Sequence, residues 1–333
     1  MKHAISLSAL LAAMLLTAAC THAPKKTPAG QADETPAGRP LTLADPTIFH
    51  CEADGMYYLY GTSPRSDFGF LAYRSSDLQH WEGPCGALEG GYVLTRETSV
   101  GNGGFWAPQV IRAAGRYAMI YTSDERLAIA FSDSPCGPFT QEERSHMPAD
   151  MKQIDPYVFV DNDGKAYLYH VRLGGGNHIW VAELADDLLS VREETAVHCL
   201  TSTPGWEDTG FVDVPITEGP TVVRMGDTYV LLYSCNDFRS PDYAVGYATA
   251  TSPLGPWTRG GTPIIHRSVL GVNGTGHGDL FQDTGKGWHY VFHTHQSDSV
   301  VAPRRTAIVD VRFEGATPVV DAATFHFLRQ PEQ

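Results

Sequence analysis

Five copies of one short strand-like pattern restrict what this chain can fold into. Each copy opens with a glycine that follows a turn of Gly, Asp or Asn, and continues into an aromatic-rich run with strand composition. The copies occupy residues 55–60, 115–121, 164–169, 226–233 and 287–292. Their glycines are 60, 49, 62 and 61 residues apart, which is the spacing of a repeat architecture.

Two further elements recur around these glycines. A second β run precedes each one, and the runs begin at Asp45-Pro46, Ala107-Pro108, Asp155-Pro156, Glu218-Gly219-Pro220 and His277-Gly278. Polar turns that lead to an aromatic residue occupy 76–81, 132–139 and 252–257. Several short strands in each of five units predict an all-β, five-bladed β-propeller over residues 41–330, with about four strands per blade. No long amphipathic helical pattern separates the units, which disfavours a TIM barrel.

Three acidic residues stand at matching places in this repeat. Asp45 and Asp155 each come directly before a proline, and Glu218 lies one residue earlier in its own unit. Because the first strand of a propeller blade lines the central channel, we expect the three carboxyl groups to face one another across it. Close, buried carboxyl groups shift one another's pKa values apart. A single Asp-Pro pair usually marks a capped turn, but three acids at one end of the channel favour a shared chemical role.

The charge of the chain argues against one class of partner. The formal net charge is -14, from 38 acidic residues against 24 Lys and Arg. No block of Lys and Arg follows the first thirty residues, which disfavours a surface that tracks phosphates. We therefore expect no nucleic-acid partner and a neutral substrate.

The N-terminus predicts export and a lipid anchor. A short basic start and an apolar run over residues 4–19 are too short for a membrane-spanning helix and are typical of a signal peptide. The run ends at Ala18-Ala19-Cys20, which resembles a bacterial lipoprotein box and predicts lipidation of Cys20. The alternative is ordinary cleavage near Ala19. Residues 21–40 are rich in Pro, Ala and polar residues and predict a flexible tether. We expect the bacterial cell envelope, with membrane contact through the anchor alone.

The five remaining cysteines indicate neither a disulfide framework nor a zinc cluster. They are Cys51, Cys85, Cys136, Cys199 and Cys235, and none forms a Cys-x-x-Cys pair. At most two disulfide bridges are possible, and the spacing does not say which cysteines would pair.

Taken in order, the motifs resemble glycoside hydrolase family 43 from about Leu41 to Phe327. The resemblance rests on these segments: Ala44-Asp45-Pro46, Phe105-Trp106-Ala107-Pro108, Ile154-Asp155-Pro156, Glu218-Gly219-Pro220, 274–278 and 303–308. It implies a five-bladed propeller that hydrolyses arabinose- or xylose-containing glycans with inversion. Asp45 would be the general base, Glu218 the general acid, and Asp155 the residue that tunes and orients the acid. Inverting enzymes hold their two working carboxyls ~6.5–9.5 Å apart, to leave room for water.

The resemblance implies weaker roles for four more residues. Trp106 and Phe68 would form apolar walls for the sugar, with blade packing as the alternative for Trp106. Arg304, chosen over the adjacent Arg305, would lie near the acid and Asp155. His277 would help to hold a structural calcium ion in the channel through water, or act only by hydrogen bonding. The chemistry itself would require no cofactor. Gln109 stands where the family often has Glu, and we assign it no catalytic role.

Three hypotheses for function remain. The first is an exo-acting α-L-arabinofuranosidase that trims plant polysaccharide. The second is a β-xylosidase or galactan-directed glycosidase. The third, from another class, is a non-catalytic propeller that binds glycans at the envelope, and the presence of all three carboxylates disfavours it. We expect a carbohydrate substrate and a monomeric chain.

Overall fold

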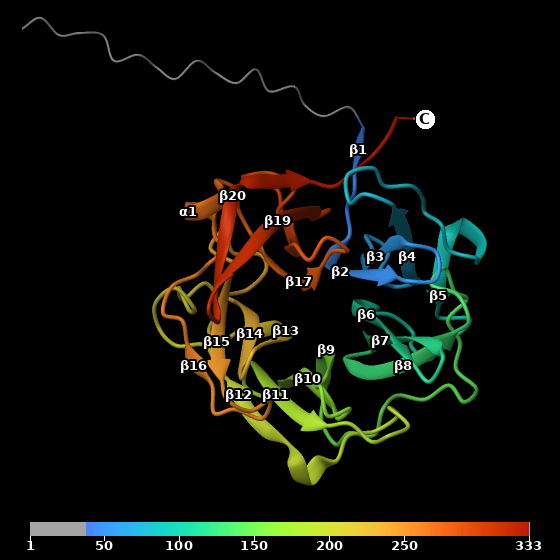
Figure 1. Ribbon diagram of the computed structural model, residues 1–333, viewed down its shortest axis with the longest axis horizontal. Coiled ribbons are helices and arrows are strands. Elements are labelled where there is room, and N and C mark those ends of the chain that lie inside the picture. The colour runs from blue at the N-terminus through green and yellow to red at the C-terminus, as the bar shows by residue number, and fades with distance from the viewer. Residues whose placement is uncertain (1–37, 333) are drawn as a thin grey trace, which may run out of the picture. The chain divides into compact units, whose positions relative to one another are not determined.

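The chain folds into five antiparallel sheets arranged in a ring, which confirms the predicted five-bladed β-propeller. The computed structural model describes residues 38–332, and Figure 1 shows β2, β6, β9, β13 and β17 as the innermost strands of the five blades. Blade 1 holds β2 (Ala44–Cys51), β3 (Met56–Thr62), β4 (Gly69–Ser75) and β5 (Tyr92–Thr95). Blade 2 holds β6 (Trp106–Ala113), β7 (Arg116–Ser123) and β8 (Arg126–Ser132).

The other three blades have four strands each. Blade 3 holds β9 (Gln153–Val160), β10 (Ala166–Leu173), β11 (Asn177–Glu183) and β12 (Val197–Leu200). Blade 4 holds β13 (Thr217–Met225), β14 (Thr228–Cys235), β15 (Ala244–Ala250) and β16 (Thr258–Arg259). Blade 5 holds β17 (Gly276–Gln282), β18 (Trp288–Thr294), β19 (Arg305–Glu314) and β20 (Thr317–Phe327). Helix is limited to α1 (Arg267–Leu270) and the short turns η1 (Glu89–Gly91) and η2 (Glu193–Thr195) among the described residues.

Blade 2 departs from the expected four strands. After β8 the chain makes one isolated bridge, between Phe131 and Thr140, and then runs to blade 3. This unit is the one with the 49-residue spacing, so it has too little chain for a full outer strand.

The repeated glycine has a conformational cause. In four blades it closes the hairpin between the first two strands with positive φ, at Gly55 (73°), Gly115 (80°), Gly164 (85°) and Gly226 (64°). Glycine adopts this left-handed conformation without the Cβ clash that other residues meet. In blade 5 the left-handed residue is Lys286 (70°), one position before the repeated glycine.

The hydrophobic core consists of five clusters, one between each pair of neighbouring blades. Adjacent residues of a strand face opposite clusters, as the period of two requires. Met119 packs between blades 1 and 2, while Ile120 packs between blades 2 and 3. Leu231 and Leu232 divide in the same way between blades 3 and 4 and blades 4 and 5. The aromatic and branched residues of the repeat are therefore buried on both faces of the sheet.

The N-terminal segment closes the ring against blade 5. β1 (Arg39–Pro40) pairs with β21 (Arg329–Gln330). The Leu41 amide then donates to the Leu328 carbonyl (2.9 Å), and the Leu41 carbonyl accepts from the Thr306 amide (3.0 Å). Arg39 and Pro40, the last residues of the expected tether, thus pair with the C-terminal segment. The expected signal peptide, Cys20 and most of the tether lie outside the described residues. Within residues 38–332, no helix has the length and apolar character needed to cross a membrane.

Candidate active site

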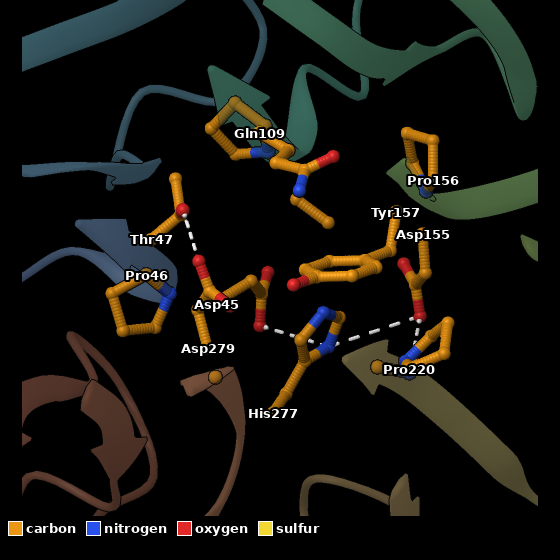
Figure 2. Close-up of a pocket in the computed structure, with 14 residues that line it drawn as sticks. Asp45, Pro46, Thr47, Gln109, Asp155, Pro156, Tyr157, Pro220, His277 and Asp279 are labelled. Atoms are coloured by element: carbon orange, nitrogen blue, oxygen red, sulfur yellow. Dashed lines mark hydrogen bonds and ion pairs between the residues drawn. The ribbon is translucent and has the colours of Figure 1, made fainter. Parts of the chain in front are cut away.

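A bulge in the first strand of every blade builds the centre of the propeller. At this point the pairing register between the first two strands shifts, and one residue has positive φ. These residues are Asp45 (48°), Ala107 (45°), Asp155 (55°), Gly219 (57°) and His277 (43°). Bulges re-aim side chains, and non-glycine residues with positive φ concentrate at functional sites. Asp45, Asp155 and His277 accordingly surround the axis (Figure 2).

In four of the five blades, the residue directly before the bulge lines a cleft. Ala44, Trp106, Ile154 and Glu218 occupy this position in blades 1 to 4, and all four line one cleft of about 770 Å³. Asp45 and Asp155 are bulge residues, whereas Glu218 is the residue before a bulge, which explains why Glu218 lies one residue earlier in its repeat. In blade 4 the bulge itself is a glycine, and the functional side chain comes from the residue before it.

Polar side chains of the second strands hold the bulges in place across blade boundaries. The Thr62 hydroxyl accepts from the Ala107 amide (3.0 Å), and the Thr122 hydroxyl accepts from the Asp155 amide (3.0 Å). Two more contacts follow the same pattern: the Ser234 hydroxyl accepts from the His277 amide (2.8 Å), and Nδ1 of His293 lies 3.2 Å from the Asp45 amide nitrogen.

Blade 3 lacks this acceptor, and Asp155 replaces it. The matching residue on β10 is Val171, which pairs with Ile154 and has no polar atom on its side chain. The Gly219 amide instead donates to Oδ2 of Asp155 (3.2 Å). Asp155 therefore anchors the backbone directly beside Glu218.

Asp45 lies among groups that favour its ionised form. Arg304 Nη1 donates to Oδ1 (3.0 Å), Thr62 donates to Oδ2 (2.6 Å), and Nδ1 of His277 lies 3.4 Å from Oδ1. Burial by itself raises the pKa of Asp45, but Arg304, His277 and His293 outweigh burial, so the pKa lies well below its ordinary value. Asp45 is a carboxylate suited to accept a proton.

Glu218 has the opposite environment. Burial is the largest effect and raises its pKa to about 7, and the charges of Asp45 and Asp237 act in the same direction. Two donors oppose this rise: the Tyr243 hydroxyl to Oε1 (2.8 Å) and the Asn177 side-chain amide to Oε2 (2.7 Å). A carboxyl group with a pKa near neutrality can hold a proton and release it to a leaving group.

The pKa of Asp155 is also raised well above its ordinary value. Burial is the main cause, and the charges of Glu218 and Asp45 add to it, while the Gly219 amide partly offsets them. The pKa of His277 is lowered, chiefly by burial, and its Nδ1 lies between Asp45 and Asp155, whose Oδ2 is 3.8 Å away.

The structure brings most of the expected substrate residues to the cleft. Trp106 and Arg304 line it, whereas Phe68 does not and instead packs edge-on against Tyr92, with ring centroids 4.9 Å apart. Arg304 contacts the expected base, Asp45, rather than the acid. Arg305 lies over the ring of Phe327.

Gln109, without an assigned role, ties blade 2 to blade 3. Its Oε1 accepts from the Val158 amide (2.6 Å), and its Nε2 donates to the Val158 carbonyl (3.2 Å). A carboxylate at this position would have no hydrogen to donate to that carbonyl.

The expected calcium ion would lie beside His277 in the central channel. No group of three or more His, Cys, Asp or Glu side chains within residues 38–332 is arranged to hold a metal ion. Calcium prefers oxygen ligands, and the hydroxyls of Thr47 and Thr221 both donate to Asp279 (2.6 and 2.9 Å). The expectation of calcium beside His277 gains no support from these residues.

Three residues of the site were missed by sequence reasoning. Tyr243 and Asn177 hold Glu218, and His293 contacts both Asp45 (3.2 Å) and Arg304 (3.2 Å). Aligning the ends of the five glycine strands would have found His293, because the same position holds Thr62, Thr122 and Ser234. No comparable signal marks Asn177, which follows three glycines at the start of β11, or Tyr243.

Fold and site together define a class of protein: a glycoside hydrolase, with an ionised carboxylate and a protonatable carboxyl group in one cleft at the centre of a propeller. The sequence profile described as glycosyl hydrolases family 43 matches residues 39–318, and the chain belongs to this family.

Individual relatives agree with that assignment. The chain is 26% identical over 324 residues to a β-D-galactofuranosidase of Aspergillus niger, covering 89% of this chain and 87% of the relative. It is 26% identical to a xylosidase/arabinosidase of Bacteroides ovatus, covering 74% and 88%. Among solved structures, an endo-1,4-β-xylanase of Bacteroides thetaiotaomicron superposes with a TM-score of 0.80 at 34% identity, covering 88% of this chain and 98% of that one. A thermostable family-43 glycoside hydrolase gives 0.75 at 30% identity, with 90% and 97% covered.

Proposed function

We propose that this protein is an exo-acting α-L-arabinofuranosidase that removes terminal arabinose from plant polysaccharide with inversion. The observation that carries the proposal is the pair of opposed carboxyl groups. Asp45 has a pKa held well below its ordinary value, and Glu218 has a pKa of about 7 in the same cleft. Groups tuned apart in this way serve as base and acid of one reaction.

In the proposed step, Asp45 takes a proton from a water molecule as that water attacks the anomeric carbon. Glu218 gives its proton to the glycosidic oxygen as the bond to that oxygen breaks. The two transfers balance, because one proton enters at Asp45 and one leaves from Glu218. Arg304 and Thr62 keep Asp45 ionised before attack, while Asn177 and Tyr243 stabilise the glutamate anion that remains after transfer.

Two features support action on a single terminal sugar. The cleft volume of about 770 Å³ lies in the range of sites that enclose one small ligand. Two of the similar proteins are a galactofuranosidase and a xylosidase/arabinosidase by name. Arabinofuranosyl groups of the α-L series share their ring configuration with β-D-galactofuranosyl groups and lack only the outermost carbon. The second candidate is therefore a β-D-galactofuranosidase, and a β-xylosidase is the third.

A panel of nitrophenyl glycosides tests the choice of sugar. We expect the largest kcat/KM for the α-L-arabinofuranoside, with lower values for the β-D-galactofuranoside and the β-D-xylopyranoside. A higher value for either of the last two replaces the first candidate with that sugar. No turnover of any glycoside or arabinan by the wild type would favour the binding-only hypothesis.

The stereochemistry of the product tests the roles of Asp45 and Glu218. The two residues belong to blades 1 and 4, which blade 5 separates in the ring. Direct attack by water inverts the configuration of the anomeric carbon. Attack by Asp45 itself would retain that configuration and needs carboxyl groups only ~5–5.5 Å apart. Proton NMR in the first minutes of hydrolysis identifies the anomer that forms first, and a retained product would make Asp45 a nucleophile.

We also propose that Cys20 carries a lipid that anchors the enzyme to the bacterial cell envelope. The support is the apolar segment that ends at Ala18-Ala19-Cys20 and the polar, proline-rich segment that follows it. An enzyme held at the envelope by a flexible tether would bind polysaccharide fragments as they reach the cell surface.

A further inference from the structure

Two cysteines from neighbouring blades meet on the outer part of the propeller. Cys85 lies between β4 and β5 of blade 1, and Cys136 follows β8 of blade 2. Their sulfur atoms are 3.6 Å apart, and both side chains are half-buried. All five cysteines in the described part of the chain are present as thiols.

The backbone already holds these two segments together. The Ala87 amide, two residues after Cys85, donates to the carbonyl of Cys136 (2.9 Å). Three residues after Cys136, the Phe139 amide donates to the Val93 carbonyl of blade 1 (2.7 Å). A disulfide bond is about 2.05 Å long, so the sulfurs need to approach by about 1.5 Å, which is a distance that side-chain rotation covers.

We propose that Cys85 and Cys136 form a disulfide site that joins blade 1 to blade 2 when the protein meets a small-molecule disulfide such as oxidised glutathione. The thiolate of Cys136 attacks the glutathione disulfide, forms a mixed disulfide and releases one glutathione. Cys85 then loses its proton and attacks the sulfur of Cys136, which releases the second glutathione. Two electrons pass to the glutathione pair, which also takes up the two protons.

The reactivities of the thiols fit this order. The pKa of Cys136 is lowered to about 7, first by its contact with Cys85 and further by Tyr58 and Arg74, against the effect of burial. A larger thiolate fraction makes Cys136 the attacking group. The pKa of Cys85 is raised by its contact with Cys136 and by burial, so it is the thiol that completes the bridge.

The other described cysteines have different neighbours. Cys51 is buried with its sulfur 3.1 Å from the Tyr117 hydroxyl. Cys235 is buried 3.9 Å from the Thr217 hydroxyl, and Cys199 lies 3.8 Å from the Val197 carbonyl. Among residues 38–332, sulfur meets sulfur only at Cys85 and Cys136.

Peptide mapping of the full-length wild type tests the proposal without any substitution. The reduced protein is incubated with oxidised glutathione, alkylated, digested without reduction and analysed by mass spectrometry. We expect one cross-linked pair that contains Cys85 and Cys136, and two fewer alkylated thiols than in the reduced sample. Glutathione or alkyl groups on both cysteines, or a bridge from either one to Cys51, would overturn the proposal.

The melting temperature supplies a second readout. A bridge across a loop of this length should raise the Tm of the oxidised wild type by about 5 °C over the reduced form. Cys85→Ser should abolish this difference, whereas Cys199→Ser should preserve it. Activity should be equal in both redox states, because neither cysteine lines the cleft. An equal Tm before and after full bridging would contradict the role as a cross-link between blades.

Discussion

Asn177 donates its side-chain amide to the carboxylate of Glu218 across 2.7 Å, so a residue of blade 3 controls the acid of blade 4. The bond is possible because the first residue of β11 is held against the segment before β13. The backbone N–H of Asn177 donates to the Pro215 carbonyl (2.9 Å), and the Asn177 backbone forms a parallel bridge with Ile216. The acid therefore depends on a contact between blades as well as on its own strand.

Replacing Asn177 should move the pH dependence of the reaction. Its hydrogen bond favours ionised Glu218, so Asn177→Ala should raise the pKa of Glu218 above about 7 and move the basic limb of kcat/KM upward by about 1 pH unit. His178→Ala is the matched control, because the neighbouring side chain contacts Thr201 instead (2.7 Å). An unchanged basic limb in Asn177→Ala would show that the contact has no electrostatic role.

Loss of either working carboxyl group should nearly abolish activity. We expect Asp45→Asn and Glu218→Gln each to lower kcat by at least ~10²-fold, the usual scale for general acid–base groups. Glu218→Gln should lose less with a dinitrophenyl leaving group, which needs no proton, whereas Asp45→Asn should not recover. Asp186→Asn, with a side chain 98% exposed, serves as the control. Near wild-type turnover in either variant removes that residue from its assigned role.

The backbone anchor beside the acid can be tested with Val171. Asp155→Asn keeps an oxygen for the Gly219 amide, whereas Asp155→Ala removes it, so Asp155→Ala should be about tenfold slower than Asp155→Asn. Adding Val171→Thr to Asp155→Ala restores the hydroxyl that three other blades use, and should recover part of the loss. Steady-state rates of the three variants decide this, and equal rates for Asn and Ala would exclude the anchor.

Glu218 should make the protein less stable as the pH rises. Its folded pKa of about 7 exceeds the unfolded value near 4.3, so the folded state binds the extra proton. The contribution of Glu218 to the free energy of unfolding is then largest below about pH 4 and falls by about 4 kcal/mol as the pH rises through 7. Glu218→Gln removes this term and should raise Tm relative to the wild type more at pH 8 than at pH 5. Thermal unfolding at both values measures the difference, and an identical difference at both would contradict the assigned pKa.

Lipidation can be tested by removing the acceptor. Cys20→Ala should give a protein that no longer partitions into the detergent phase, while the wild type does. The comparison uses the two chains expressed in the same bacterial host. Equal partitioning would favour ordinary cleavage near Ala19.

The sequence alone determined the repeat and therefore the fold. Glycine at Gly55, Gly115, Gly164 and Gly226 is a local requirement of a left-handed hairpin residue, so it is visible at regular spacing. Residues buried on both faces appear as continuous apolar runs for the same local reason. Asp45 and Asp155 could be paired in advance because each occupies the bulge of its own first strand.

Tertiary structure decided what surrounds the three acids, because those neighbours come from other blades. Arg304 of blade 5 reaches Asp45 of blade 1 only when the ring closes, and Phe68 packs against Tyr92 and does not line the cleft. Val171 has no acceptor to offer, so the role of Asp155 as an anchor for Gly219 follows from the contact between blades 3 and 4. The pKa values of Asp45 and Glu218 diverge through burial and charge at distances of a few ångström, and the order of residues along the chain does not encode these distances.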